Sequence, residues 1–350
     1  MKLTDFRTLG RSGLIVSPMA LGAMTFGTPR WGSPDEVSES IFNAYVDAGG
    51  NFIDTADIYA KGRSEELVGE YIGKRGLRDK LVLATKFSFN AEPGNPHAGG
   101  NGRKNLHRAL EGSLRRLKTD YVDLFWMHVW DQVTPVEELL QSTGDLVRAG
   151  KIRYFAFSDV PAWYAASAAM LARTANIPGP IALQMPYSLI ERGIEREHVP
   201  AAREFGMGIT PWSPLAAGFL AGKYSRDHVG KVNTGGGRLD LNLPSFQLFT
   251  ERNWQVLERV RAVASEAGLD MAKMSLAWAM AQPGITSLIL GASKVEQLES
   301  NLAALDLTLS PEILKKLDEA SGTDLTMMDR FFSPGLKKGV FGGADVTGWR

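Results

Sequence analysis

The sequence has no cysteine, which excludes disulfide bonds and thiolate chemistry but says nothing about the compartment. It also lacks any apolar run approaching 18 residues, and its N-terminus, Met1 to Asp5, has no apolar signal core. Neither a membrane span nor export is therefore expected, and a cytoplasmic protein is the default. The 39 basic and 39 acidic side chains cancel, without any run of five like charges. Since nucleic-acid binding needs a basic patch, no such partner is expected.

Patterns for nucleotide and metal sites are also missing. No strand-like run is followed by Gly-x-Gly-x-x-Gly, and no Walker A lysine loop occurs. Four histidines, His97, His107, His198 and His228, show no ligand spacing with one another or with acids, so we expect no metal site. What is present is the composition of an ordinary globular chain, with 44% hydrophobic and 22% charged residues among 350.

Short apolar runs alternate with segments of helical periodicity along the chain. Two apolar pieces around a glycine turn, between Leu9 and Ser17, predict an N-terminal β-hairpin. Buried strands are then predicted at 19–22, 52–54, 81–86, 121–127, 152–157, 181–185, 208–212 and 286–290. The helices between and after them are predicted at 37–48, 64–74, 104–117, 135–149, from 161, 196–205, 251–267 and 295–302, with Ser64 as an N-cap and Pro161 as a first helical residue.

Eight strand–helix units in alternation predict an α/β fold, a (β/α)8 barrel, with a doubly wound open sheet as the alternative. The barrel is expected over about residues 18–303 of a single domain spanning 1–350, followed by a C-terminal extension over about 304–350. Two extra helices, 271–281 and 311–320, are expected to pack outside the barrel.

Titratable side chains follow three of these strands, where parallel barrels keep their chemistry. Asp54 ends the second strand, with Tyr59 five residues later, while Lys86 and His128 end the third and fourth. Each has a simpler interpretation: a helix-capping acid, a packed tyrosine, a paired core lysine and a core histidine with satisfied hydrogen bonds. Together, on one rim, they favour a site for proton transfer.

The chemistry follows from the residue types. An ammonium group near Tyr59 lowers the pKa of the phenol from its reference value of ~10, so that Tyr59 with Lys86 can donate a proton to a developing alkoxide. A neutral His128 can orient a carbonyl oxygen, and Asp54 keeps Lys86 charged. Since none of these groups supplies an electron pair, we expect hydride transfer from a nicotinamide cofactor.

From the hairpin at Leu9 to Asn301 the chain resembles an aldo-keto reductase, through Ile53-Asp54-Thr55-Ala56, Ala84-Thr85-Lys86 and Trp126-Met127-His128. The resemblance implies the catalytic tetrad Asp54, Tyr59, Lys86 and His128, and reversible reduction of an aldehyde or ketone with NADPH. The pair Ser293-Lys294 resembles the branch of potassium-channel β-subunits. An NADP-binding regulatory or scaffold protein with slow turnover is therefore the alternative.

The resemblance also implies the cofactor residues. Ser158, Asp159 and Gln184 would hold the carboxamide, and Tyr187 would stack on the nicotinamide ring. Further cofactor contacts are implied for three residues at and after the end of the first strand, Gly22, Met24 and Thr25. A segment that covers the pyrophosphate would consist of Trp212, Ser213, Pro214, Leu215, Gly218, Lys223 and Arg238. A segment that binds the adenosine half would consist of Gly291, Ser293, Lys294, Gln297 and Asn301. The loop from Lys223 to Gly237 is expected to be a mobile lid.

Three positions depart from the family pattern. Many members have asparagine at Asp159, glycine at Ala60, and at Ser293 an arginine that grips the 2′-phosphate of NADPH. Because Lys294 can neutralise that phosphate as a point charge, NADP is expected, with NAD as the alternative.

Trp31, Phe87, Trp126 and Trp130 are expected to line the substrate pocket, for a neutral carbonyl compound or its alcohol. The sequence leaves open the identity of the substrate, the physiological direction and the oligomeric state, and a homo-oligomer is compatible with it.

Overall fold

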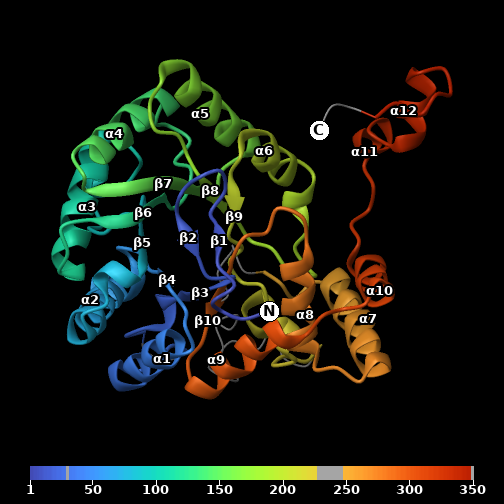
Figure 1. Ribbon diagram of the computed structural model, residues 1–350, viewed down its shortest axis with the longest axis horizontal. Coiled ribbons are helices and arrows are strands. Elements are labelled where there is room, and N and C mark those ends of the chain that lie inside the picture. The colour runs from blue at the N-terminus through green and yellow to red at the C-terminus, as the bar shows by residue number, and fades with distance from the viewer. Residues whose placement is uncertain (29–30, 227–246, 348–350) are drawn as a thin grey trace.

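A computed structural model describes residues 1–28, 31–226 and 247–347 (Figure 1). Its centre is a parallel sheet in the order β10-β3-β4-β5-β6-β7-β8-β9. The strands are β3 (Met19–Gly22), β4 (Phe52–Asp54), β5 (Val82–Phe87), β6 (Val122–Met127), β7 (Ile152–Ser158), β8 (Ala182–Gln184), β9 (Gly208–Ile209) and β10 (Leu288–Gly291).

The sheet closes on itself. Ile209 of β9 forms a parallel bridge with Ile285, and the N–H of Thr286 donates to the Ile209 carbonyl at 2.8 Å. On the other side of β10, Gly291 pairs with Gly22 of β3. The predicted (β/α)8 barrel is therefore confirmed, and the open sheet is wrong.

The hairpin of β1 (Arg7–Thr8) and β2 (Ile15–Val16) covers the amino ends of the barrel strands (Figure 1). Leu9 and Leu14, at its turn, are buried against residues from inside the barrel. Gly10 has φ +61°, and a Cβ there would lie 2.5 Å from the Ile181 carbonyl oxygen. Only glycine permits this approach, which plugs the end opposite the predicted site.

Helices surround the barrel as the periodicity predicts (Figure 1). They are α1 (Asp35–Asp47), α2 (Arg63–Arg75), α3 (Arg103–Leu117), α4 (Val136–Arg148), α5 (Ala162–Ala175), α6 (His198–Phe205), α7 (Glu251–Ala267), α8 (Met271–Ala281), α9 (Val295–Leu302) and α10 (Pro311–Ser321). Ser64 lies inside α2, whose N-cap is Gly62, and its hydroxyl donates to the Ala23 carbonyl at 2.7 Å. Pro161 is the N-cap of α5 and not its first residue.

One pair of helices exchanges the expected places. We expected 271–281 outside the ring and 251–267 within it. Instead α8 packs against α9 in the ring, with Met274 and Trp278 fully buried, while α7 packs against α10 outside (Figure 1). The apolar stripe of α8, which the sequence shows, is therefore part of the main core.

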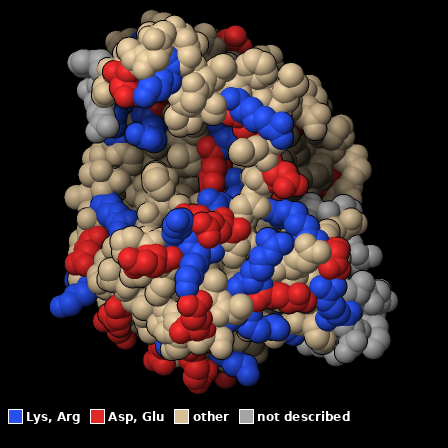
Figure 2. Space-filling view, turned by 90° about the vertical axis from the view of Figure 1, so that its right-hand side faces the viewer, with Lys and Arg blue, Asp and Glu red and all other residues tan. Residues whose placement is uncertain are grey.

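Beyond α10 the chain forms an arm, residues 322–347, with two short helices, α11 (Met327–Phe331) and α12 (Pro334–Val340). Figure 1 shows them standing away from the barrel, and neither helix contains a buried residue. Arg196 attaches the arm through an ion pair with Asp329 (3.2 Å) and a bond to the Asp324 carbonyl (2.8 Å). The adjoining face carries interspersed charges of both signs (Figure 2).

Within the described ranges, no helix has the length and apolarity that crossing a membrane requires. The same residues contain no cluster of three or more His, Cys, Asp or Glu side chains suited to a metal ion.

Candidate active site

Lys86 is the centre of the predicted tetrad and is fully buried. Strand register sets Lys86 beside Trp126 and Asp54 beside Ala84, so that these side chains project into the barrel near the carboxyl ends of the strands. The Lys86 ammonium donates to the Asp54 carboxylate, to the Thr55 carbonyl (2.9 Å) and to the Tyr59 hydroxyl (3.2 Å). All three of its hydrogen-bond donors therefore have acceptors.

Burial acts against the charge of both members of this pair, and it raises the pKa of Asp54 despite the nearby Lys86 ammonium. Burial by itself lowers the pKa of Lys86, but the negative charge of Asp54 and the hydrogen bonds to Asp54 and Tyr59 outweigh it and raise the pKa. The Asp54 carboxylate also accepts from the Gln184 amide at 3.1 Å. We therefore treat Lys86 as an ammonium throughout the neutral pH range.

His128 lies on the other side of Tyr59. The two rings meet edge to face, with centroids 5.7 Å apart. Burial, and then the charge of Lys86, lowers the pKa of His128 well below 6.5, so the imidazole is neutral. Its Nδ1 atom is buried without a hydrogen-bond partner in the described part of the chain. A neutral imidazole and a phenol thus lie side by side next to one ammonium.

The loop that carries Tyr59 has an unusual backbone. Ala60, Lys61 and Gly62 follow it with φ of +47°, +57° and +93°, three consecutive residues in the left-handed region. A residue with a Cβ pays roughly 1–2 kcal/mol for this conformation. A glycine at position 60 would avoid this cost, so Ala60 makes the loop more strained.

Four of the predicted carboxamide-binding and pyrophosphate residues lie next to the tetrad. Ser158 and Gln184 pair at the ends of β7 and β8, and the Ser158 hydroxyl is buried without a partner among the described residues. Asp159 accepts from the Trp212 indole N–H at 3.0 Å, and burial raises its pKa to about 6. An unpaired hydroxyl, an amide and a carboxyl group match the donors and acceptors of a carboxamide.

The expected pyrophosphate segment follows β9. Ser213, Ala216, Ala217 and Gly218 have positive φ values, and a Cβ on Gly218 would lie 2.8 Å from the Lys223 side chain. Pro214 is buried and Leu215 half-buried. Arg238 lies outside the described residues, as do residues 227–237 of the expected lid.

The expected adenosine segment begins where β10 ends. Gln297 accepts from the Ser293 backbone N–H (3.0 Å) and hydroxyl (3.1 Å), which fixes the turn into α9. Lys294 is exposed at the N-cap, and Asn301 is half-buried near the end of the helix. Across the rim, the Thr25 hydroxyl donates to the Ala292 carbonyl at 2.7 Å, beside half-buried Met24. A cationic side chain at a helix N-terminus is suited to a phosphate.

Two of the four predicted substrate residues are buried in the core. Phe87 is 1% exposed and stacks on Phe125 in the layer between sheet and helices. Trp126 is fully buried inside the barrel. Neither can contact a substrate without a rearrangement of the core. Trp31 and Trp130 are half-buried, and Trp130 packs edge-on against the exposed Trp163.

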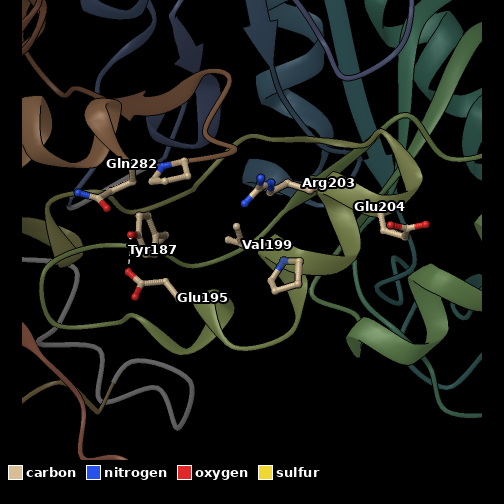
Figure 3. Close-up of a pocket in the computed structure, with 8 residues that line it drawn as sticks. Tyr187, Glu195, Val199, Arg203, Glu204 and Gln282 are labelled. Atoms are coloured by element: carbon tan, nitrogen blue, oxygen red, sulfur yellow. Dashed lines mark hydrogen bonds between the residues drawn. The ribbon is translucent and has the colours of Figure 1, made fainter. Parts of the chain in front are cut away.

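Tyr187 also lies away from the predicted ring site. Its ring stacks on Trp278, and its hydroxyl donates to Glu195 at 2.6 Å. Figure 3 shows this bond in a groove of ≈ 780 Å³ that Arg203 and Gln282 also line. These contacts give no support to stacking on a nicotinamide, since they fix the ring in a groove beside α6.

Phe89, which follows β5, was not among the site residues predicted from the sequence. Its ring is 45% exposed and meets His128 edge to face, with centroids 4.8 Å apart. Its position in the sequence could have predicted a place at the rim, because Phe89 is the third residue after Lys86 and follows the end of β5. It is an exposed aromatic side chain in contact with the tetrad.

Comparisons with known proteins agree with this geometry. The model of the aldo/keto reductase family matches residues 18–321. The chain belongs to the aldo/keto reductase family. An NADP(+) aryl-alcohol dehydrogenase of Phanerodontia chrysosporium is 36% identical over 323 residues, covering 88% of this chain and 83% of that protein. A probable voltage-gated potassium channel β-subunit of Oryza sativa is 34% identical, covering 90% and 95%.

A norsolorinic acid reductase of Dothistroma septosporum is 34% identical to this aldo/keto reductase, over 93% of the chain and 83% of its own length. Such relatives, named as dehydrogenases and reductases, make this aldo/keto reductase an oxidoreductase. The arm after residue 321 lies outside the part that the family model matches.

Proposed function

We propose that this aldo/keto reductase transfers hydride between NADP(H) and a neutral aryl aldehyde or ketone, with Tyr59 as the acid and base. One observation carries the proposal: a single buried ammonium, Lys86, bonds both Asp54 and Tyr59, beside a neutral His128. This arrangement suits proton transfer to an oxygen atom and offers no activated nucleophile.

In reduction, the carbonyl oxygen accepts hydrogen bonds from Tyr59 and His128. The hydride for the carbonyl carbon would come from NADPH, held by the residues named below. As negative charge develops on the oxygen, Tyr59 transfers its proton there and becomes a phenolate. The Lys86 ammonium stabilises that phenolate, and Asp54 keeps Lys86 charged. In the reverse direction the phenolate takes the proton of the alcohol.

The cofactor assignment rests on fit and on the relatives. The unpaired Ser158 hydroxyl, Gln184 and Asp159 would hold the carboxamide, and Lys294 at the start of α9 would neutralise the 2′-phosphate. The name of the Phanerodontia relative includes NADP(+). We therefore propose NADP(H) over NAD(H).

The aryl substrate is proposed from the exposed rings at the rim. Phe89 contacts His128, and Trp130 with Trp163 forms an aromatic wall after β6. Flat apolar walls suit ring-bearing substrates. The printed names of relatives, aryl-alcohol dehydrogenase and norsolorinic acid reductase, point the same way. The scaffold alternative is not favoured.

Tyr59→Phe tests the proposal. The variant should bind NADPH normally, measured by fluorescence quenching. It should lose ~10²- to 10⁴-fold in kcat with a benzaldehyde, because the hydroxyl that transfers the proton is removed while the ring stays. Near-normal kcat would refute the assignment. A parallel screen of neutral aryl aldehydes, aliphatic aldehydes and sugar phosphates should show a preference for the aryl compounds; a preference for phosphorylated substrates would contradict the substrate class.

A further inference from the structure

Glu65, outside the tetrad, is a fully buried carboxylate in the first turn of α2. One of its oxygens accepts from the Thr85 hydroxyl at 2.5 Å, and the other accepts from the Arg116 Nε–H at 2.6 Å. Removing a carboxylate from water is costly in free energy, and burial is tolerated only when the charge is paired and hydrogen-bonded. The mechanism above gives this ion pair no role.

The Thr85 bond fixes the strand that carries Lys86. Thr85 immediately precedes Lys86 in β5, and alternation along the strand directs Lys86 into the barrel and Thr85 towards the helices. Glu65 therefore fixes the outer face of β5 at the level where Lys86 lies inside. The Asp57 N–H, two residues before Tyr59, also donates to the Lys86 carbonyl at 3.1 Å.

Arg116, in the last turn of α3, fixes the loop that carries Tyr59. Its side chain lies against Gly62, where a Cβ would be 2.7 Å from Arg116 Cδ and 3.0 Å from its Nε. Gly62 is the last of the three left-handed residues after Tyr59. A loop in this conformation persists only where its surroundings hold it, and Arg116 covers it from outside.

We propose that Glu65 and Arg116 form a positioning pair, which ties the Lys86 strand to the Tyr59 loop and holds the Tyr59 hydroxyl within reach of the Lys86 ammonium. The inference rests on the proposed roles of Tyr59 and Lys86 in proton transfer. Neither Glu65 nor Arg116 touches the reacting groups. Their loss should lower kcat and leave substrate and cofactor binding nearly unchanged.

The main variants are Glu65→Gln, which keeps the size and the Thr85 bond but removes the charge, and Arg116→Met, which keeps a stem over Gly62 without a donor. Arg116→Lys keeps the charge and should restore part of the activity. The matched control is Asp123→Asn. Asp123 pairs with Arg78 at 2.8 Å and accepts from the Leu83 N–H, so it also ties an ion pair to β5, but at the amino end of the barrel.

We expect Glu65→Gln and Arg116→Met to lower kcat at least tenfold, with the aldehyde KM and the NADPH Kd within about twofold of wild type. The control should lose thermal stability to a similar extent but keep its kcat. Combining Glu65→Gln with Tyr59→Phe should add no further loss in kcat. The pair is merely structural if the control loses as much activity at an equal loss of Tm, or if KM and Kd rise while kcat does not change.

Hydrogen exchange of the protein without cofactor gives a readout that is independent of turnover. The Tyr59 and Lys61 amides donate within the loop, to Ala56 and Ile58. Exchange of a peptide spanning 56–62 should accelerate in Glu65→Gln. It should also accelerate in the Arg116 variant that folds, Arg116→Met or Arg116→Lys, but not in the control Asp123→Asn. Unchanged exchange would overturn the proposal. Faster exchange together with an active Tyr59→Phe would instead refute the proposed function and leave the positioning intact.

Discussion

Asp54→Asn should leave Lys86 as an uncompensated charge inside the barrel. The Lys86 side chain is 0% exposed, and after the substitution its ammonium keeps only neutral acceptors, at the Thr55 carbonyl, the Tyr59 hydroxyl and the new amide. Removing one partner of a buried ion pair costs about 3–5 kcal/mol. With a urea m-value of ~3 kcal/mol/M, the unfolding midpoint should fall by about 1 to 1.7 M.

The dependence of stability on pH should change sign. In the wild type the pKa of Lys86 is raised in the folded state, so its contribution is fully present at neutral pH and is lost only as pH rises through that raised value. In Asp54→Asn no carboxylate opposes the effect of burial, which lowers the pKa of Lys86 below that of the unfolded chain. The variant should therefore become more stable as pH rises, by up to ~1.4 kcal/mol per pH unit while Lys86 titrates.

Urea unfolding at pH 7 and pH 9, followed by circular dichroism, measures both effects. The midpoint of Asp54→Asn should rise over this interval, relative to wild type. The double variant Asp54→Asn/Lys86→Met is the control, since it removes both charges and should recover much of the lost stability. Identical pH dependence in the single variant and the wild type would show that Lys86 is not an enclosed charge, and the electrostatic account of the tetrad would be wrong.

Other substitutions test single charges. Burial, and then the charge of Glu65, raises the pKa of Asp57 to about 7. The wild type should therefore lose stability from pH 5 to pH 7, by up to ~1.4 kcal/mol per pH unit. Asp57→Asn should remove this loss in urea titrations, and an unchanged slope of stability against pH would contradict the assignment. Lys294→Ala should weaken NADPH roughly tenfold more than NADH in fluorescence titrations, whereas equal losses would show that Lys294 does not bind the 2′-phosphate. Above pH 6 the Asp159 carboxylate should favour NADP⁺, whose nicotinamide ring is positive, over NADPH. Asp159→Asn should therefore reduce the affinity for NADP⁺ relative to that for NADPH several-fold. An unchanged ratio would show that Asp159 does not lie beside the nicotinamide ring.

The sequence was sufficient for the barrel and for the assembly of the tetrad. Each strand of a parallel barrel is a short apolar run, and Asp54, Lys86 and His128 each stand where such a run ends. Because all carboxyl ends meet at one rim, position along the strand was enough to bring them together. Tyr59 lies only five residues from Asp54, so a short loop had to keep it nearby.

Side-chain direction explains where the structure places Phe87, Trp126 and Tyr187 differently from the expectation. Phe87 follows Lys86 in β5, so when Lys86 projects inward Phe87 must face the helices, and alternation could have excluded it from the pocket. Trp126 does face inward, but its depth depends on how the ring packs inside the barrel. Tyr187 lies three residues beyond the end of β8, where strand alternation no longer fixes direction. For the choice between α7 and α8, Met274 and Trp278 on the apolar stripe of α8 were a sequence signal for a buried helix, and this signal was not used.

The closure of the barrel sets an order for its assembly. β4, β5 and β6 lie within residues 52–127, so Asp54 and Lys86 can meet while the ribosome is still making the second half of the chain. β3 pairs with β10, ~270 residues further on, and at 5–20 residues per second its free edge waits on the order of tens of seconds for that partner. Until then β3 exposes unpaired backbone groups that other chains can bind. Asp54, Tyr59 and Lys86 can thus come together before the rim from Gly291 onward exists, and protection of the β3 edge by a chaperone would matter most in that interval.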